Sequence, residues 1–345
     1  MLLPGNTDIF PRCLAVLKKP STAKHRSKIP VIAGVRLLGR EGHMSYDLSN
    51  ILVVGISTRA LFDLEKDNEL FEKEGVEKYI NYELENVDNI LRPGTGFRLV
   101  KNILALNSGL KKKLVEVIIL SRNNAVTSLR ITQSIEHHGL DITRSAWTGG
   151  EEISRYLSPY KVDLFLSANE HDVQEAIDAG FAAARIYKFG KFTPVTKIDK
   201  QLIKIAFDGD AVIFSDESEK IYKEKGLEAF IEHERENANK PMPEGPFASL
   251  LKSISVVQTE FKDKDRPCPI RTALITARSS PAHERIIRTL AAWGVMINEV
   301  HFMGGVSKHE VLEAFRADIF FDDQDVHCKP ASGVVPTAKV PYKST

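Results

Sequence analysis

The chain alternates short apolar runs with longer amphipathic segments. Ile51–Ile56 is a continuous apolar run of the kind that forms a buried parallel strand. Val115–Leu120 and Val162–Leu166 predict two more strands, while Ser128–His138 predicts a helix that Gly139 would cap at its C-terminus. Strands that alternate with helices predict a parallel sheet with right-handed crossovers, and thus an α/β fold.

The same order of strands and helices recurs in the second half of the chain. At an offset of 155 residues, 117–170 aligns with 272–325 without a gap, and at an offset of 151 residues, 57–79 aligns with 208–230. Few residues are identical, but the strands, several glycines and a strand-end Asp coincide. We therefore predict a tandem duplication of one α/β unit. The alternative is that all doubly wound units share this order of strands, helices and turn glycines without a duplication.

The repeat sets the expected domain boundaries at 44–195 and 196–345. Residues 1–43 differ from both units, because they carry eight Lys and Arg against Asp8 and Glu41. They lack the apolar stretch and cleavage site of a secretory signal, and four prolines disfavour one long amphipathic helix. We expect a poorly ordered basic extension here, with Met44 as an alternative start of the protein.

Polar residues stand at the ends of the predicted strands in the second unit. Three strand ends and one glycine turn supply the candidate catalytic residues, which are Asp208, Asp210, Thr276, Lys308, Asp322 and Asp323. Because the carboxyl ends of parallel strands lie along one edge of a sheet, we expect these side chains to meet in one crevice. The equivalent positions of the first unit carry no carboxylate and are Ser57, Arg59, Ser121, Ile153, Ser167 and Ala168. The first unit is therefore predicted to be degenerate and the second to be catalytic.

This set of side chains is suited to phosphate chemistry. An aspartate at a strand end can attack phosphorus and form an acyl phosphate, and a second carboxylic acid two residues later can protonate the leaving oxygen. Mg²⁺ prefers hard oxygen ligands, which carboxylates at strand ends supply. A Thr hydroxyl and a Lys ammonium can bind the remaining phosphoryl oxygens and offset the negative charge of the site.

The ordered set of DxD, Thr, Lys and an acidic pair resembles the haloacid dehalogenase (HAD) superfamily. Longer segments look like the cytosolic type I 5′-nucleotidases, notably FDGDAVIFSDESEKIYKEKGLEAF at 207–230, ITARSSPAHERIIRTL at 275–290 and DDQDVHCKPASGVVPTAKVPY at 322–342. The resemblance covers 47–342. It implies tandem HAD-like Rossmann-type units and Mg²⁺-dependent hydrolysis of nucleoside 5′-monophosphates to nucleoside and phosphate, through an aspartyl-phosphate intermediate.

The resemblance also implies a role for each candidate residue. Asp208 is the expected nucleophile and a metal ligand. Asp210 is the expected general acid and base, with its backbone carbonyl as a second metal ligand. The remaining four residues are expected to bind the phosphoryl group (Thr276 and Lys308) or the metal (Asp322 and Asp323).

Other positions carry further expectations. Arg278 is a candidate substrate ligand, with a surface ion pair as the alternative. Asp318 has an identical counterpart, Asp163, in the degenerate unit, so we expect a structural role for it. The charged segment Glu217–Glu236 is typical of a solvated amphipathic helix pair. It falls within a predicted helical cap insertion at about 215–268, which would help to close the site over the nucleoside.

Composition excludes several classes of protein. A net charge of +1 over 345 residues argues against a protein that binds nucleic-acid polymers by bulk charge. No apolar run approaches the roughly 18 residues of a membrane span. The three cysteines lack the paired spacing of a disulfide framework or a zinc site. We therefore expect a cytoplasmic protein that binds neither nucleic-acid polymers nor membranes. The resemblance implies a nucleoside monophosphate as the substrate, and we also expect a homo-oligomer.

The degenerate unit leaves a regulatory alternative open. Ser57, Arg59, Ser121 and Arg122 place hydroxyl and guanidinium groups where phosphate would otherwise bind, so a nucleotide effector is one hypothesis for this position. The alternative is that both arginines lie in ion pairs and that the unit is a scaffold. For the whole protein, the alternatives are a HAD phosphatase for another phosphomonoester and a nucleotide-sensing regulatory protein.

Overall fold

The computed structural model of the protein describes residues 47–189, 202–262, 268–279 and 282–344. The basic extension predicted at 1–43, the alternative start at Met44 and the predicted boundary between 195 and 196 lie outside the described residues. We refer to 47–189 as the N-terminal half and to 202–344 as the C-terminal half.

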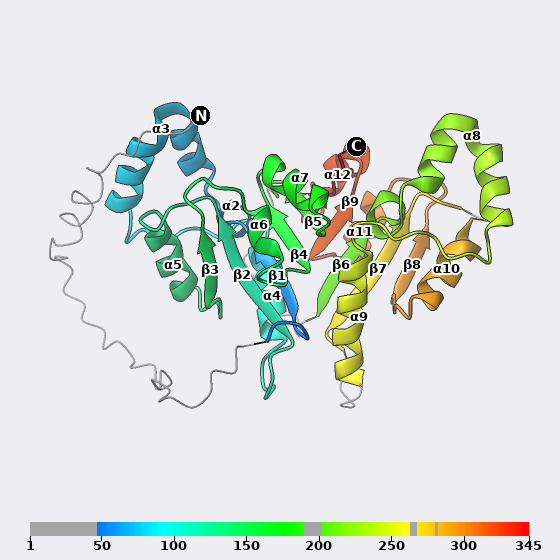
Figure 1. The fold of residues 1–345 in the computed structure, drawn as a ribbon, viewed down its shortest axis with the longest axis horizontal. Helices are drawn as coiled ribbons and strands as arrows, with labels where there is room; N and C mark the ends of the chain where they lie inside the picture. Colours follow the sequence, from blue (N-terminus) through cyan, green and yellow to red (C-terminus); the bar gives the residue numbers. More distant parts are fainter. Residues whose placement is uncertain (1–46, 190–201, 263–267, 280–281, 345) are drawn as a thin grey trace.

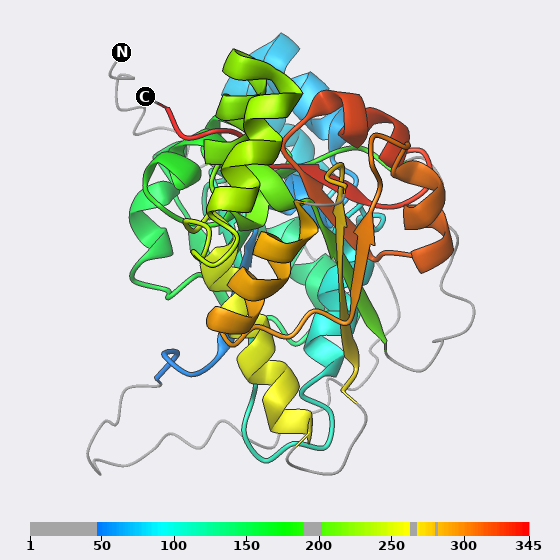
Figure 2. The same ribbon diagram turned by 90° about the vertical axis from the view of Figure 1, so that its right-hand side faces the viewer.

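The described residues form a ten-stranded sheet with helices on both faces (Figures 1 and 2). The strand order is β3-β2-β1-β4-β5-β10-β9-β6-β7-β8. The strands of the N-terminal half are β1 (Leu52–Ile56), β2 (Val115–Ser121), β3 (Arg144–Trp147), β4 (Leu164–Ser167) and β5 (Ala183–Ile186). Those of the C-terminal half are β6 (Ile203–Phe207), β7 (Ile270–Thr276), β8 (Glu299–Phe302), β9 (Ile319–Asp322) and β10 (Thr337–Lys339).

The central strands are apolar because helices cover them on both sides. Every residue of β1, β2 and β4 is buried, as the continuous apolar runs in the sequence predicted. The predicted strands agree with the observed ones to within a few residues at each end. The α/β class and the mostly parallel sheet are thus confirmed.

The two halves meet through an antiparallel strand pair. Among the described strands, each neighbouring pair is parallel except β5 and β10, where Ala338 lies opposite Ile186. Counted outward from this junction, the order is 5-4-1-2-3 in one half and 10-9-6-7-8 in the other. The pairing joins two edge strands that would otherwise expose unpaired N–H and C=O groups, so the two predicted parallel sheets merge into one.

The helices of the N-terminal half are α2 (Thr58–Leu61), α3 (Glu65–Glu85), α4 (Phe97–Ala105), α5 (Ser128–His137), α6 (Ser154–Leu157) and α7 (Glu170–Asp178). Those of the C-terminal half are the π-helical turn η1 (Gly209–Ile213), α8 (Glu217–Glu236), α9 (Ala248–Lys262), α10 (His283–Ala292), α11 (His309–Phe315) and α12 (Asp325–Ala331). None of the helices in the described ranges is both long and apolar enough to cross a membrane.

Two kinked helices rise above the same edge of the sheet, α3 over one half and α8 over the other (Figure 1). Each kink lies at a glycine with a positive φ, 82° at Gly75 and 84° at Gly226. Residues with a side chain rarely adopt this conformation, so the glycine lets each helix fold back into two legs.

The predicted cap insertion is divided in the structure. Its first part, α8, stands at the rim of the sheet. Its second part, α9, packs against η1 and across the junction against β1, where Leu251 and Ile254 are buried. The segment at the rim is therefore α8 alone.

Each half also holds a helix of the other half through an aspartate, part-buried Asp163 in one and buried Asp318 in the other. Asp163 accepts a hydrogen bond from the backbone N–H of Val53 at 2.8 Å and one from Ser253 of α9 at 2.8 Å. Asp318 accepts one from the N–H of Lys204 at 2.9 Å and pairs with Arg98 of α4 at 2.9 Å. The matching contacts confirm that Asp318 has a structural role.

Candidate active site

The candidate nucleophile lies where β6 ends and η1 begins. Asp208 follows the last residue of β6 and is the N-terminal cap residue of η1, with 5% of its surface exposed. A Cβ atom at Gly209 would lie 3.3 Å from Oγ1 of Thr276, so the glycine lets this turn approach the end of β7 closely. Two of the predicted site residues are therefore brought together by a strand-end turn.

One lysine joins the two carboxylates that stand at the ends of β6 and β9. Lys308, at the start of α11, places its Nζ 2.8 Å from Oδ1 of Asp208 and 2.7 Å from Oδ2 of Asp322. All three side chains are at least nine-tenths buried. Because a buried charge is stable only when it is compensated, this lysine and these carboxylates depend on each other.

The acidic residues of the site carry more negative charge than Lys308 can offset. Burial raises the pKa of Asp208 to about 7, with a further contribution from the charge of Asp322 and opposition from Lys308. Burial and the charge of Asp208 raise the pKa of Asp323 to about 8. Burial alone would lower the pKa of Lys308, but the two carboxylates raise it above its ordinary value.

The acidic residues have the geometry and chemistry of a divalent-metal site. Asp208, Asp322 and Asp323 each offer a carboxylate oxygen, and these oxygens all lie within 4.8 Å of one another. Oδ1 of Asp323 is buried and has no hydrogen-bond partner. Three crowded carboxylates of this kind fit a hard cation such as Mg²⁺.

A pocket of about 460 Å³ opens beside these residues. Asp208, Asp210 and Thr276 line it together with side chains of α8. His327, which the sequence places just after the acidic pair, also borders the pocket. The carboxyl ends of the strands and the rim helix thus enclose a single site.

Arg278 lies in this pocket but is engaged by two acids. Its Nε and Nη2 donate to the two carboxylate oxygens of Asp210 at 2.8 and 2.6 Å, and its Nη1 donates to Glu234 at 2.6 Å. Its side chain is 3% exposed, so the pair is buried and not the surface ion pair considered as the alternative. Glu234 was missed by the prediction of a solvated helix pair, which is wrong at this residue because its side chain is fully buried.

Two further residues of the site, Tyr342 and Glu219, were not among the predicted candidates, although both lie in segments that resemble the family. Tyr342, near the C-terminus, donates a hydrogen bond to Asp323 and lies 2.9 Å from Glu219 of α8. Glu219 in turn accepts a hydrogen bond from Gln324 at 3.0 Å. These contacts link the rim helix to the acidic pair. For Glu234, the internal repeat could have indicated its importance, because Glu83 lies 151 residues earlier, at the offset that relates the two units.

The corresponding positions of the N-terminal half form ion pairs. Arg59 pairs with Glu65 at 3.0 Å, and Arg122 pairs with Asp172 at 2.6 Å and Glu175 at 3.0 Å. These contacts match the scaffold alternative for the degenerate unit.

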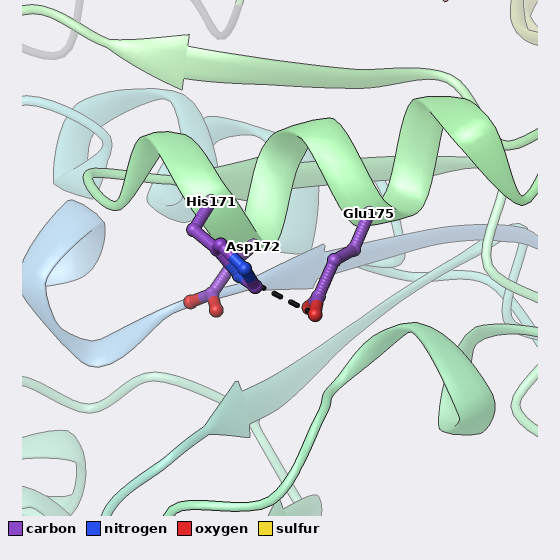
Figure 3. A group of neighbouring side chains, drawn as sticks. All are labelled: His171, Asp172 and Glu175. Carbon is purple, nitrogen blue, oxygen red and sulfur yellow. Dashed lines mark ion pairs between the residues drawn. The ribbon is translucent and has the colours of Figure 1, made fainter. Parts of the chain in front are cut away.

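A second group of possible metal ligands lies on α7, where His171, Asp172 and Glu175 point from one face of the helix (Figure 3). Asp172 and Glu175 already bind the guanidinium group of Arg122. We therefore assign no metal to this group.

The fold and the site together fit the Rossmann-like HAD class, with an acidic cluster at the carboxyl ends of parallel strands that could hold a metal ion. A family model described as 5′-nucleotidase matches residues 44–345, and the chain therefore belongs to the 5′-nucleotidase family. It is 38% identical over 291 residues to human (Homo sapiens) cytosolic 5′-nucleotidase 1B, an alignment that covers 82% of this chain and 47% of the relative. The chain thus spans about half the length of this relative. No solved structure matches the chain significantly. The resemblance to the cytosolic 5′-nucleotidases is confirmed.

Proposed function

We propose that this protein hydrolyses nucleoside 5′-monophosphates to nucleoside and phosphate, with Mg²⁺ as cofactor and a phosphorylated Asp208 as intermediate. The observation that carries the proposal is the buried cluster of Asp208, Asp322, Asp323 and Lys308 beside Thr276. Family membership and the name of the human relative support the reaction class. That name also supports a cytoplasmic location.

In the first step, a carboxylate oxygen of Asp208 attacks phosphorus and the bond from phosphorus to the 5′-oxygen breaks. The protonated carboxyl group of Asp210 gives its proton to the departing 5′-oxygen, which leaves as the nucleoside hydroxyl. Thr276 and Lys308 bind the phosphoryl oxygens and offset their charge. Bound Mg²⁺, held by Asp208, Asp322 and Asp323, would neutralise negative charge on the phosphoryl group.

In the second step, Asp210 takes a proton from water, and the resulting hydroxide attacks the phosphorus of phospho-Asp208. The bond between phosphorus and the Asp208 oxygen breaks, so that the carboxylate is restored and phosphate is released. Asp210 ends the cycle protonated, ready for the next substrate. The reaction consumes one water and needs no other reactant.

Phosphate release across a panel of substrates tests this proposal. With Mg²⁺ present, we expect release from ribo- or deoxyribonucleoside 5′-monophosphates, and we expect a chelator of divalent cations to abolish it. Release from sugar phosphates but not from nucleotides would favour a phosphatase for another phosphomonoester. Nucleotide binding without any release would instead favour the nucleotide-sensing alternative.

We propose that α8 contacts the nucleoside. Tyr222, Leu227 and Phe230 line the same pocket as Asp208 and Asp210, and the rings of Tyr222 and Phe230 lie edge to face with centroids 6.2 Å apart. Tyr222 and Leu227 are more than half exposed, so their apolar surface is accessible to a ligand in the pocket. A flat base can stack on an aromatic face of this kind.

Tyr222→Ala is expected to raise the KM for a nucleoside monophosphate about tenfold with little change in kcat, since stacking of a base on an aromatic side chain contributes roughly 1–3 kcal/mol. Phe71 of α3 is the matched control, because it lies 151 residues earlier, is similarly exposed and packs edge to face on Tyr79. Phe71→Ala should leave KM unchanged. Equal effects of both substitutions, or none from Tyr222→Ala, would exclude a base-stacking role for Tyr222.

We also propose that the chain is a tandem duplication in which only the C-terminal half is catalytic. The mirrored strand order and the matching contacts of Asp163 and Asp318 support this proposal. A nucleotide effector in the N-terminal half stays a prediction and has less support, because Arg59 and Arg122 already bind carboxylates. The homo-oligomer stays a prediction as well.

A further inference from the structure

A chain of four ionisable side chains, three of them buried, leads from the rim helix to the catalytic turn. Arg285 of α10 lies 3.0 Å from Glu234 of α8, Glu234 lies 2.6 Å from Arg278, and Arg278 binds both carboxylate oxygens of Asp210. The side chains of Arg285, Glu234 and Arg278 are each no more than 5% exposed, and that of Asp210 is 19% exposed. Arginines and acidic residues thus alternate along the chain.

The N-terminal half contains only the first link of this chain. Its equivalent pair is Arg130 and Glu83, with 3.6 Å between Nη1 and Oε1. The position of Arg278 is taken by Asn123, which instead bonds to the hydroxyl of Tyr79. Both carboxylate oxygens of Glu83 lack a hydrogen-bond partner, and burial raises the pKa of this residue to about 7.

The two halves share the arginine–glutamate pair but differ in the second arginine. The arginine–glutamate pair beneath the kinked helix is present in both halves, including the half without catalytic carboxylates, so we ascribe a structural role to it. The second arginine, Arg278, is present only in the C-terminal half, whose strand-end turn carries Asp210. The N-terminal half has Arg59 at the position equivalent to Asp210. Arg278 therefore links α8, where it contacts Glu234 and lies over the ring of Phe230 at 5.2 Å, to an acid that only this half carries.

The contacts of Arg278 also define how it acts. Its Nε and Nη2 form a bidentate fork on Asp210, which fixes both the direction and the plane of that carboxyl group. The N–H groups used for Asp210 and Glu234 are not free for a substrate phosphate in this arrangement. This geometry is that of a residue that orients another side chain.

We propose that Arg278 is a positioning residue, which fixes the carboxyl group of Asp210 and is itself held to α8 by Glu234. The inference rests on the proposed function, because it takes Asp210 to be the group that transfers the proton. It adds that the placement of the proton donor depends on α8, the same helix that we propose to contact the nucleoside. A nucleoside that orders α8 thereby orders the acid that protonates its 5′-oxygen.

Steady-state kinetics of Glu234→Gln, Arg278→Lys and the double variant test this role. Glu234→Gln keeps the shape of a side chain that is outside the pocket, and we expect kcat to fall about tenfold with KM changed less than about twofold. Arg278→Lys removes the fork and is expected to lower kcat about 100-fold, within the range for misplaced general acids. The double variant should be no slower than Arg278→Lys alone, because the effect of Glu234 on catalysis passes through Arg278.

Glu83→Gln is the matched control, since it makes the same change under the equivalent helix and should leave both kcat and KM unchanged. A rise in KM with unchanged kcat in Arg278→Lys would identify a substrate ligand and overturn the proposal. Wild-type kcat in folded Glu234→Gln would overturn it too. If that variant does not fold, Glu234→Asp replaces it in the test. Aspartate keeps the charge but is shorter by one methylene group, and a wild-type kcat would again overturn the proposal.

A wild-type protein without phosphatase activity would refute the proposed function itself, whereas an active wild type with unaffected variants would refute only the role of Arg278.

Discussion

Asp208→Asn is expected to lower the rate of phosphate release by at least about 100-fold, because an amide cannot act as the anionic nucleophile. The substitution also removes one of three carboxylates that crowd the proposed metal site. We expect the fold to survive, since burial already disfavours the charged form of Asp208 and Lys308 keeps its contact with Asp322. Release of phosphate from a nucleoside monophosphate, followed over time, is the measurement.

The control for this variant is its melting temperature, which should stay close to that of the wild type. A folded Asp208→Asn variant that retains more than about 1% of the wild-type rate would exclude Asp208 as the nucleophile. Mass spectrometry offers an independent check, because the phosphorylated intermediate should be trapped on the wild type and absent from the variant.

Lys308→Met is expected to remove activity and to destabilise the protein by about 3–5 kcal/mol without metal, the cost of leaving buried carboxylates uncompensated. Lys308 supplies the only ammonium group within ion-pair distance of Asp208 and Asp322 among the described residues. Methionine keeps the length and the apolar stem of lysine, so the loss reports on the charge. Thermal unfolding and phosphate release measure the two effects.

The same variant tests the metal site, because a bound cation can replace part of the missing charge. Added Mg²⁺ should therefore raise the melting temperature of Lys308→Met at least as much as it raises that of the wild type. Lys73→Met removes an exposed ion pair with Glu69 from α3 and serves as the control, with an expected change below about 0.5 kcal/mol. Equal stability of the two variants would show that the charge of Lys308 is not needed to hold the acidic cluster.

The class of fold and the place of the acidic cluster could be predicted from the amino-acid sequence. Apolar runs such as Val115–Leu120 predict buried strands because the signal is local and depends on neighbouring residues only. Asp208, Thr276 and Asp322 could then be placed together, since parallel strands end at one edge of a sheet and each residue directly follows or ends a strand. The repeat added that the first unit lacks the carboxylates.

The tertiary structure alone decided how the two units are joined and which residues support the site. The antiparallel pair of β5 and β10 is short, and nothing in the sequence of either strand specifies its partner. Glu234 lies in a segment rich in charge, and only the packing of α8 against Arg278 and Arg285 shows that it is buried. Tyr342 reaches Asp323 because the last residues of the chain return to the rim of the sheet. Such contacts join residues far apart in the sequence, so they depend on the path of the chain, which local patterns of polarity do not encode.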